Sequence, residues 1–205
     1  RHAIRIALSQ SGHPTHIAKL AGALLGELLY ERGQLDEAQV LLDDAYALGV
    51  EGGIVDVMLA TYRAGAYAMS ARGDTAGAEL RLSEGIGHAR ALGLPRLEAG
   101  LVLTHIRVAA LSGKEIDSAL ARRVMAYGVQ DLDESRDLTA EFREDAQIRL
   151  LLRDGQPAAL ASACERARVR IDHTDKLQRP RSLGVRPCSV GCNSWSETGS
   201  RPCWC

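Results

Sequence analysis

The chain has 205 residues, of which 25% are charged and 4% aromatic, and its formal net charge is −1. This balance excludes a generic polyanion-binding surface, so we expect no direct contact with nucleic acid. Uncharged runs, such as residues 155–164, are shorter than the roughly 20 residues of a membrane helix. No signal-peptide pattern opens the chain, which predicts a cytoplasmic protein without membrane contact.

A short motif recurs at a near-constant interval. It reads Arg-Gly-Gln-Leu-Asp-Glu-Ala from Arg32 and Arg-Gly-Asp-Thr-Ala-Gly-Ala from Arg72, and two weaker copies follow. The motif glycine stands at positions 33, 73, 113 and 155, which are 40, 40 and 42 residues apart. A fixed period of this length is the signature of a repeat protein.

Helical patterns flank each motif glycine. Ahead of the first one, apolar residues recur at steps of three and four residues, as in Ile17, Leu20, Leu24 and Leu28. We therefore predict helical hairpins, each with a tight turn at the motif glycine, over residues 15–49, 54–93, 95–128 and 134–172. Glycines that suit a left-handed C-terminal cap follow the second helices at positions 49, 93 and 128.

A single hairpin cannot bury its own apolar stripe, so neighbouring hairpins must stack. The pattern predicts an all-α fold, an α-solenoid with a period of about 40 residues. We assign residues 1–172 to this repeat domain and interpret residues 1–11 as the last helix of an earlier repeat. Because the first residue is Arg and not Met, we expect the chain to be a fragment of a longer array.

The composition changes sharply in the tail, residues 173–205. The last 30 residues hold four of the five Cys, both Trp and a single acidic residue. A segment with so few aliphatic residues cannot bury enough surface to order itself, so we predict disorder. The spacing of Cys188, Cys192, Cys203 and Cys205 does not match the paired knuckles of a zinc site, so we expect no metal. Out-of-frame translation is an alternative origin for this tail.

The first hairpin resembles a tetratricopeptide (TPR) repeat in its order of small and large residues. Gly26 and Ala38 are small where two helices approach closely, and Leu25, Leu29 and Leu42 surround them. The second hairpin departs from the pattern, because Gly65 stands where a leucine is expected. Overpacking at Ala38 or its counterpart in the second hairpin would therefore be costly.

The long period and several phrases are similar to the TPR-like region of MalT-type LuxR-family ATP-dependent transcriptional regulators. The phrases are Leu-Leu-Tyr-Glu-Arg-Gly from Leu28 and Ala-Leu-Gly-Leu-Pro-Arg-Leu from Ala91. A similar region occurs in PknK-type serine/threonine kinases, which the phrase from Glu51 resembles. The resemblance covers residues 1–172 and leaves the type of parent protein open.

That resemblance implies a binding groove on the concave face of the solenoid, lined by residues of the first helices. In this sequence the expected groove residues are Glu27, Tyr30, Arg63, Tyr67 and Arg107. Tyrosine supplies rigid amphipathic contact area, and arginine supplies a fork for carboxylates. The expected ligand is a protein segment or a small-molecule effector.

The sequence gives no sign of catalysis. It contains no phosphate loop, no kinase motif and no DNA-binding helix-turn-helix after the repeats. We interpret His105 as a hydrogen-bonded histidine of the core or groove, and Cys164 as a small core residue. The acidic residues are expected to form a solvated face; they include Asp36, Glu37, Asp43, Asp44, Glu134, Glu141, Glu144 and Asp145.

We therefore predict a non-enzymatic module without a cofactor. In the first hypothesis it is the ligand-binding segment of a signal-responsive regulator or kinase, whose ATPase or kinase and DNA-binding domains are absent from this chain. In the second hypothesis it is a free-standing TPR adaptor that mediates protein–protein interactions.

Overall fold

A computed structural model describes residues 16–49, 54–127 and 138–176 of the chain. Every regular element in these ranges is a helix, which confirms the all-α class. The chain divides into two compact units, residues 1–168 and 169–205, and all contacts given below lie within the first. In the described ranges, no helix is long and apolar enough to cross a membrane.

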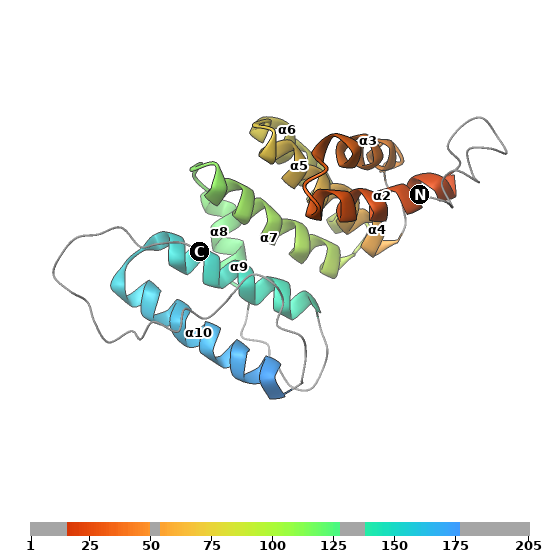
Figure 1. Cartoon of the computed structure of the whole chain (residues 1–205). Coiled ribbons are helices and arrows are strands. Elements are labelled where there is room, and N and C mark those ends of the chain that lie inside the picture. Colours follow the sequence, from red (N-terminus) through yellow and green to blue (C-terminus); the bar gives the residue numbers. More distant parts are fainter. Residues whose placement is uncertain (1–15, 50–53, 128–137, 177–205) are drawn as a thin grey trace. The chain divides into compact units, whose positions relative to one another are not determined.

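The described helices form successive pairs (Figure 1). The first pair is α2 (His16–Glu31) and α3 (Leu35–Tyr46). In the second pair, α4 (Val55–Leu59), η2 (Ala60–Ala64) and α5 (Gly65–Ala71) run on as one helix, which is paired with α6 (Thr75–Ala91). The third pair is α7 (Pro95–Leu111) and α8 (Ser118–Met125), and the fourth is α9 (Leu138–Asp154) and α10 (Pro157–Lys176). These pairs correspond to the four predicted hairpins. The last helix ends four residues beyond the predicted boundary at residue 172, and the predicted tail from residue 177 onward lies outside the described residues.

The motif glycines end the first helix of each pair. Gly33, Gly73, Gly113 and Gly155 have φ angles of 72°, 86°, 66° and 70°. This left-handed conformation is strained for a residue with a Cβ atom, which explains why glycine recurs at these positions. The predicted caps at positions 49 and 93 also have positive φ, 56° and 64°, whereas position 128 lies outside the described residues.

The two helices of the first hairpin approach closely at Gly26. A Cβ atom on this residue would lie 2.8 Å from Leu42 Cγ and 3.3 Å from the carbonyl oxygen of Ala38. Ala38 and Leu42 are fully buried. The small residues of the repeat pattern therefore have the role predicted for them, which is to let the two backbones come together.

The third hairpin departs from the predicted tight turn. In the first two hairpins the second helix begins two residues after the motif glycine, but α8 begins only at Ser118, five residues after Gly113. The helix starts there because Asp117 caps it, and its Oδ2 accepts a hydrogen bond of 3.1 Å from the backbone N–H of Leu120. The shortened α8 ends at Met125.

Successive hairpins stack through buried apolar side chains. Ala64, on the first helix of the second hairpin, belongs to a buried cluster with Leu29 and Leu42 of the first hairpin. Leu97, on α7, belongs to a larger cluster that includes Leu82 of the second hairpin. The first helices of the second and third hairpins therefore each bury one face against the hairpin before them, as a solenoid requires.

Polar contacts also join successive repeats. Arg72 forms an ion pair with Asp36, and Lys114 Nζ lies 3.0 Å from Glu79 Oε2. The paired residues are 36 and 35 positions apart, so each contact joins one repeat to the next. Asp36 thus remains largely solvated, as predicted, but it also has a partner on the following hairpin.

Candidate binding face on the first helices of the hairpins

The five predicted groove residues all stand on first helices. Glu27 and Tyr30 belong to α2, Arg63 to η2, Tyr67 to α5 and Arg107 to α7. α7 contacts both the α4–α5 helix and α9, so the row of first helices is continuous. We call the surface that carries these five residues the first-helix face.

An ion pair forms at the beginning of this face. Arg63 Nη2 lies 2.5 Å from Glu27 Oε1, and the two side chains are 32% and 26% exposed. Glu27 and Arg63 stand 36 positions apart, on consecutive hairpins. Partial exposure leaves both charged groups accessible to a ligand, although each already has one partner.

Two aromatic rings stack next to this ion pair. The ring centroids of Tyr30 and Tyr67 are 5.8 Å apart, and the ring planes meet at 15°. Burial raises the pKa of Tyr30, with smaller contributions from the neighbouring Tyr67 and Glu31. The phenol of Tyr30 therefore stays protonated at neutral pH and acts as a hydrogen-bond donor and acceptor.

Arg107 links the stack to the following hairpin. It hydrogen-bonds to Tyr67, and its Nη2 donates a hydrogen bond of 3.1 Å to Asp145 Oδ2 on α9. Burial by itself lowers the pKa of Arg107, but Tyr67 and Asp145 outweigh this effect and the pKa is raised. The structure thus brings the predicted residues into contact with one another, and their role in binding stays a prediction.

Two functional candidates on this face were not predicted from the sequence. Asp145, expected on a solvated surface, is only 7% exposed, and Arg149 Nε lies 3.4 Å from its Oδ1. Arg107 and Arg149 together neutralise this buried carboxylate, which explains why burial is tolerated. The available signal was the repeat register, because Asp145 stands 38 positions after Arg107.

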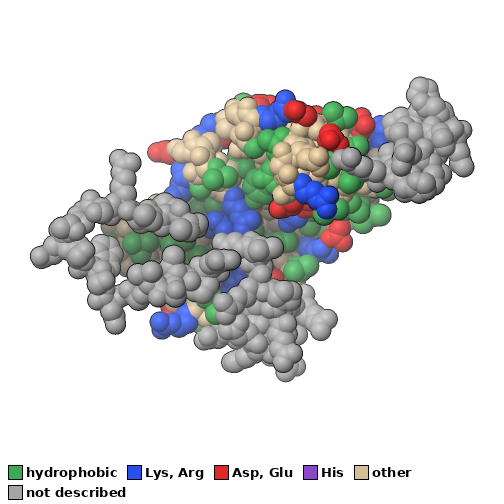
Figure 2. Space-filling model, in the orientation of Figure 1, with side chains coloured by type: hydrophobic (Ala, Val, Ile, Leu, Met, Phe, Trp, Pro, Cys, Tyr) green, Lys and Arg blue, Asp and Glu red, His purple; other side chains and the backbone are tan. Residues whose placement is uncertain are grey.

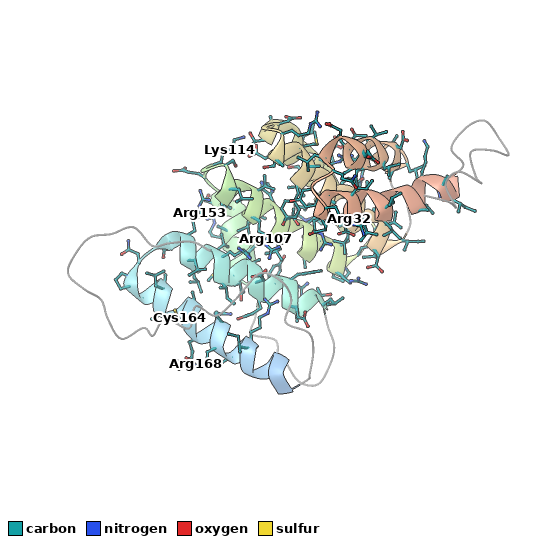
Figure 3. The ribbon with its side chains drawn as sticks, in the orientation of Figure 1. Arg32, Arg107, Lys114, Arg153, Cys164 and Arg168 are labelled. Atoms are coloured by element: carbon teal, nitrogen blue, oxygen red, sulfur yellow. The ribbon has the colours of Figure 1, made fainter. Side chains whose placement is uncertain are left out.

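Basic side chains dominate the middle of the face. Figure 2 shows Lys and Arg atoms gathered near the centre of the view, at the place where Figure 3 labels Arg107. Arg107 and Arg149 both form ion pairs with one acidic side chain, Asp145. The excess of positive charge favours acidic groups in a ligand.

A cavity of about 310 Å³ opens beside the tyrosine stack. Its walls are formed by Tyr30, Tyr67, Ser70, Ala71, Thr75, Leu111 and Ser112. Leu111 is 78% exposed, so it offers apolar surface that the fold does not use. The combination of two rings, one leucine and several hydroxyl groups suits an amphipathic ligand group.

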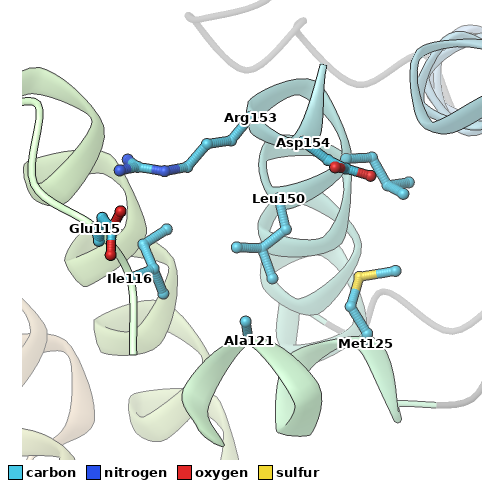
Figure 4. Close-up of a pocket in the computed structure, with 8 residues that line it drawn as sticks. Glu115, Ile116, Ala121, Met125, Leu150, Arg153 and Asp154 are labelled. Atoms are coloured by element: carbon cyan, nitrogen blue, oxygen red, sulfur yellow. The ribbon is translucent and has the colours of Figure 1, made fainter. Parts of the chain in front are cut away.

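A second hollow of about 390 Å³ lies between the end of α9 and α8 together with the residues just before α8. In Figure 4, Ile116 and Leu150 face each other across it, with Ala121 and Met125 on α8. Arg153 extends over one end and donates a hydrogen bond to the backbone carbonyl of Lys114. The hollow is therefore mostly apolar and partly closed by an arginine.

Two predictions about single residues are wrong. Cys164 is exposed and not a core residue; its neighbour Ala163 is buried instead. His105 Nδ1 is buried without a hydrogen-bond partner among the described residues, so this histidine is not satisfied as expected. Burial lowers the pKa of His105, against the opposing effects of Glu79 and Asp117.

The described residues bring no three His, Cys, Asp or Glu side chains together in a metal-binding group. The exposed Cys164 stands on α10, and His105 stands on α7. The arrangement on the first-helix face, with stacked rings, paired charges and an open cavity, suits recognition.

The chain is similar to a segment of the serine/threonine-protein kinase PknK. The PknK proteins of Mycobacterium tuberculosis and Mycobacterium bovis are each 40% identical to it over 181 residues. The matched stretch covers 88% of this chain but only 16% of the curated relatives. No family model matches the chain. No solved structure matches it either.

The similarity to PknK includes the greater part of the helical repeats. With 88% of the chain matched, the stretch must contain most of the described hairpins and of the first-helix face. The coarse description of this protein is thus an all-helical chain that is similar to part of a kinase. The resemblance to PknK-type kinases agrees with this similarity, whereas the link to MalT-type regulators stays a prediction.

Proposed function

We propose that the chain is a non-catalytic binding module that holds an extended polypeptide segment on its first-helix face. The parent we favour is a signal-responsive serine/threonine kinase, because the chain is similar to a segment of PknK. A LuxR/MalT-type transcriptional regulator remains the alternative parent, and a free-standing TPR adaptor the alternative role. In each case the module binds a ligand and catalyses no reaction itself.

The observation that carries the proposal is the tyrosine stack beside an open cavity. Tyr30 and Tyr67 present rigid rings, and exposed Leu111 adds an apolar wall. Burying such groups against a ligand side chain gains contact area at little conformational cost. The cavity is therefore suited to a leucine or aromatic side chain of the bound segment.

The charges next to the cavity define a second element of recognition. Arg63 and Arg107 keep about a third of their side chains exposed, and arginine binds carboxylates through two parallel hydrogen bonds. The hydroxyl groups of Ser70 and Thr75 line the cavity and suit the backbone of an extended peptide. The expected ligand is an extended segment with an apolar side chain close to an acidic one.

Fluorescence anisotropy with overlapping peptides tests this proposal. The peptides tile the Mycobacterium tuberculosis PknK sequence outside the stretch matched by this chain. We expect the binding peptides to contain an apolar residue near Asp or Glu. Tyr30→Ala should weaken their binding by roughly 30-fold, as truncation of an aromatic hot spot does.

Leu111→Asp is a second variant that leaves the fold intact, because Leu111 is 78% exposed. It places a negative charge in the cavity wall and should also weaken binding. Leu80→Asp is its control, since Leu80 is 61% exposed and does not line the cavity. Absence of binding by every peptide, or equal losses with Leu80→Asp, would contradict the proposal.

A further inference from the structure

An apolar stripe on α2 has no partner in the described part of the chain. Ile17, Leu24 and Leu28 are 75%, 44% and 60% exposed. They recur at steps of seven and four residues, so they share one face of the helix. Exposed apolar side chains that are contiguous on one face mark an interaction surface more often than scattered ones do.

The repeat register shows what this face does in the other hairpins. The residues 80 positions later, two repeats along the chain, are Leu97, Thr104 and Val108 on α7. Their exposed fractions are 0%, 1% and 0%. The same stripe of the first helix is therefore buried on α7 and exposed on α2.

The buried stripe packs against the hairpin that precedes it. Leu97 and Val108 belong to the cluster that contains Leu82 on α6. In the second hairpin, Ala64, the residue in register with Leu24, is buried against Leu29 and Leu42 of the first hairpin. In these two junctions, this stripe is covered by the hairpin that stands earlier in the array.

We propose that the stripe of Ile17, Leu24 and Leu28 is the docking face for a further helical hairpin of the same register, joined ahead of α2. The occupant is a helix pair, because α7 contacts both α4 and α6 of its preceding hairpin. A single helix would cover only part of such a face. The inference rests on the surface of α2 and is independent of the proposed function.

An extended chain tests this inference. A copy of residues 54–94 is joined directly to Thr15, so that Leu94 of the copy precedes α2 as it precedes α7 in the chain. This hairpin is chosen because it already receives Leu97 and Val108, which are close in size to Ile17 and Leu28. Hydrogen exchange of the α2 amides and thermal unfolding are measured with and without the added hairpin.

The stripe is removed by Ile17→Glu combined with Leu28→Lys, which leaves the net charge unchanged. Val40→Glu combined with Leu80→Lys is the matched control, because Val40 and Leu80 are also exposed, at 63% and 61%. We expect the added hairpin to slow exchange of the α2 amides by at least roughly tenfold. The stripe variant should abolish this protection, while the control variant should retain it.

Thermal unfolding supplies an independent readout. The stripe variant should lower the melting temperature of the extended chain and leave that of the original chain unchanged. The proposal fails if exchange of α2 is the same in both chains, or if the added hairpin stays unfolded or melts separately. It also fails if the original chain sediments as a dimer that the stripe variant dissociates, since a second copy would then be the occupant.

Discussion

The guanidinium of Arg81 occupies the space that a side chain at Gly65 would need. A Cβ atom on Gly65 would lie 2.5 Å from Arg81 Nη1. Arg81 is only 3% exposed; its Nη2 donates a hydrogen bond of 3.0 Å to the carbonyl oxygen of Leu42 and lies 2.9 Å from Asp43 Oδ1. One buried arginine thus joins α6 to the first hairpin, and Gly65 makes room for it.

Gly65→Ala should therefore destabilise the protein. The added methyl group displaces a guanidinium that is held by hydrogen bonds and an ion pair, and overpacking of this kind costs roughly 1–3 kcal/mol. This loss exceeds the gain of about 0.5–1 kcal/mol that alanine brings inside a helix. Urea unfolding at equilibrium measures the difference.

Gly87→Ala is the control for this prediction. Gly87 lies within α6 and has no neighbouring atom within 4 Å of its Cβ position. Here only the stabilising effect of alanine inside a helix remains, so the free energy of unfolding should rise by about 0.5–1 kcal/mol. Equal gains for both glycines would show that Arg81 does not depend on the space at Gly65.

The sequence identifies Gly65 as a departure from the repeat pattern but does not explain it. In the first hairpin the position in register is Leu25, and Arg81 corresponds to Leu41. The exchange of two apolar residues for a glycine and an arginine is compensated only in space, because the two residues are 16 positions apart. Periodicity predicts which positions face the core, but it does not predict which partners meet there.

A larger side chain at Ala78 tests whether the two helices of the second hairpin approach closely there. Ala78 is fully buried, so Ala78→Leu should overpack the hairpin and cost roughly 1–3 kcal/mol. Ala76→Leu, two residues earlier on the same helix, is the control because Ala76 is exposed. If the two variants unfold at the same urea concentration, the assigned register of this hairpin is wrong.

The candidate binding face illustrates the same limit of sequence analysis. The first-helix positions of Tyr67 and Arg107 follow from the period, and the structure places both on one face. The sequence predicts a solvated Asp145, because acidic residues are rarely buried. Its burial depends on two arginines, of which Arg107 stands on the preceding hairpin, a relationship that no local pattern contains.

The raised pKa of Tyr46 predicts a loss of stability at alkaline pH. Burial and a hydrogen bond to Glu84 raise the pKa of Tyr46 from 10.0 to about 12. Because the folded state holds the proton more tightly than the unfolded state, the stabilisation is complete below pH 10 and is lost as the pH rises toward 12. Tyr46→Phe should reduce this loss in urea unfolding measured across that range.

The loss should be reduced and not abolished, because burial also raises the pKa values of Tyr30 and Tyr62. Tyr127→Phe, which removes a hydroxyl group elsewhere, controls for the substitution itself. An unchanged alkaline profile in Tyr46→Phe would mean that burial and the hydrogen bond to Glu84 do not raise the pKa of Tyr46 in solution.

The lowered pKa of His105 predicts a loss of stability at acidic pH. Its pKa is lowered from 6.5, chiefly by burial, so the unfolded state binds the proton more readily than the folded state. The associated stability is present above pH 6.5 and is lost as the pH falls below that value. His105→Gln should flatten the dependence of the urea midpoint between about pH 7.5 and pH 5.

Two carboxylates near His105 act against the effect of burial on its pKa, and they provide a second test of this prediction. Glu79 on α6 and Asp117, the cap of α8, both favour the protonated form of His105, but burial is the largest effect. Glu79→Gln should therefore lower the pKa of His105 further and steepen the loss of stability in acid. His16→Gln, at the start of α2, removes a histidine that lies elsewhere and serves as the control. A rise in the NMR-measured pKa of His105 above 6.5 would show that the two carboxylates outweigh burial.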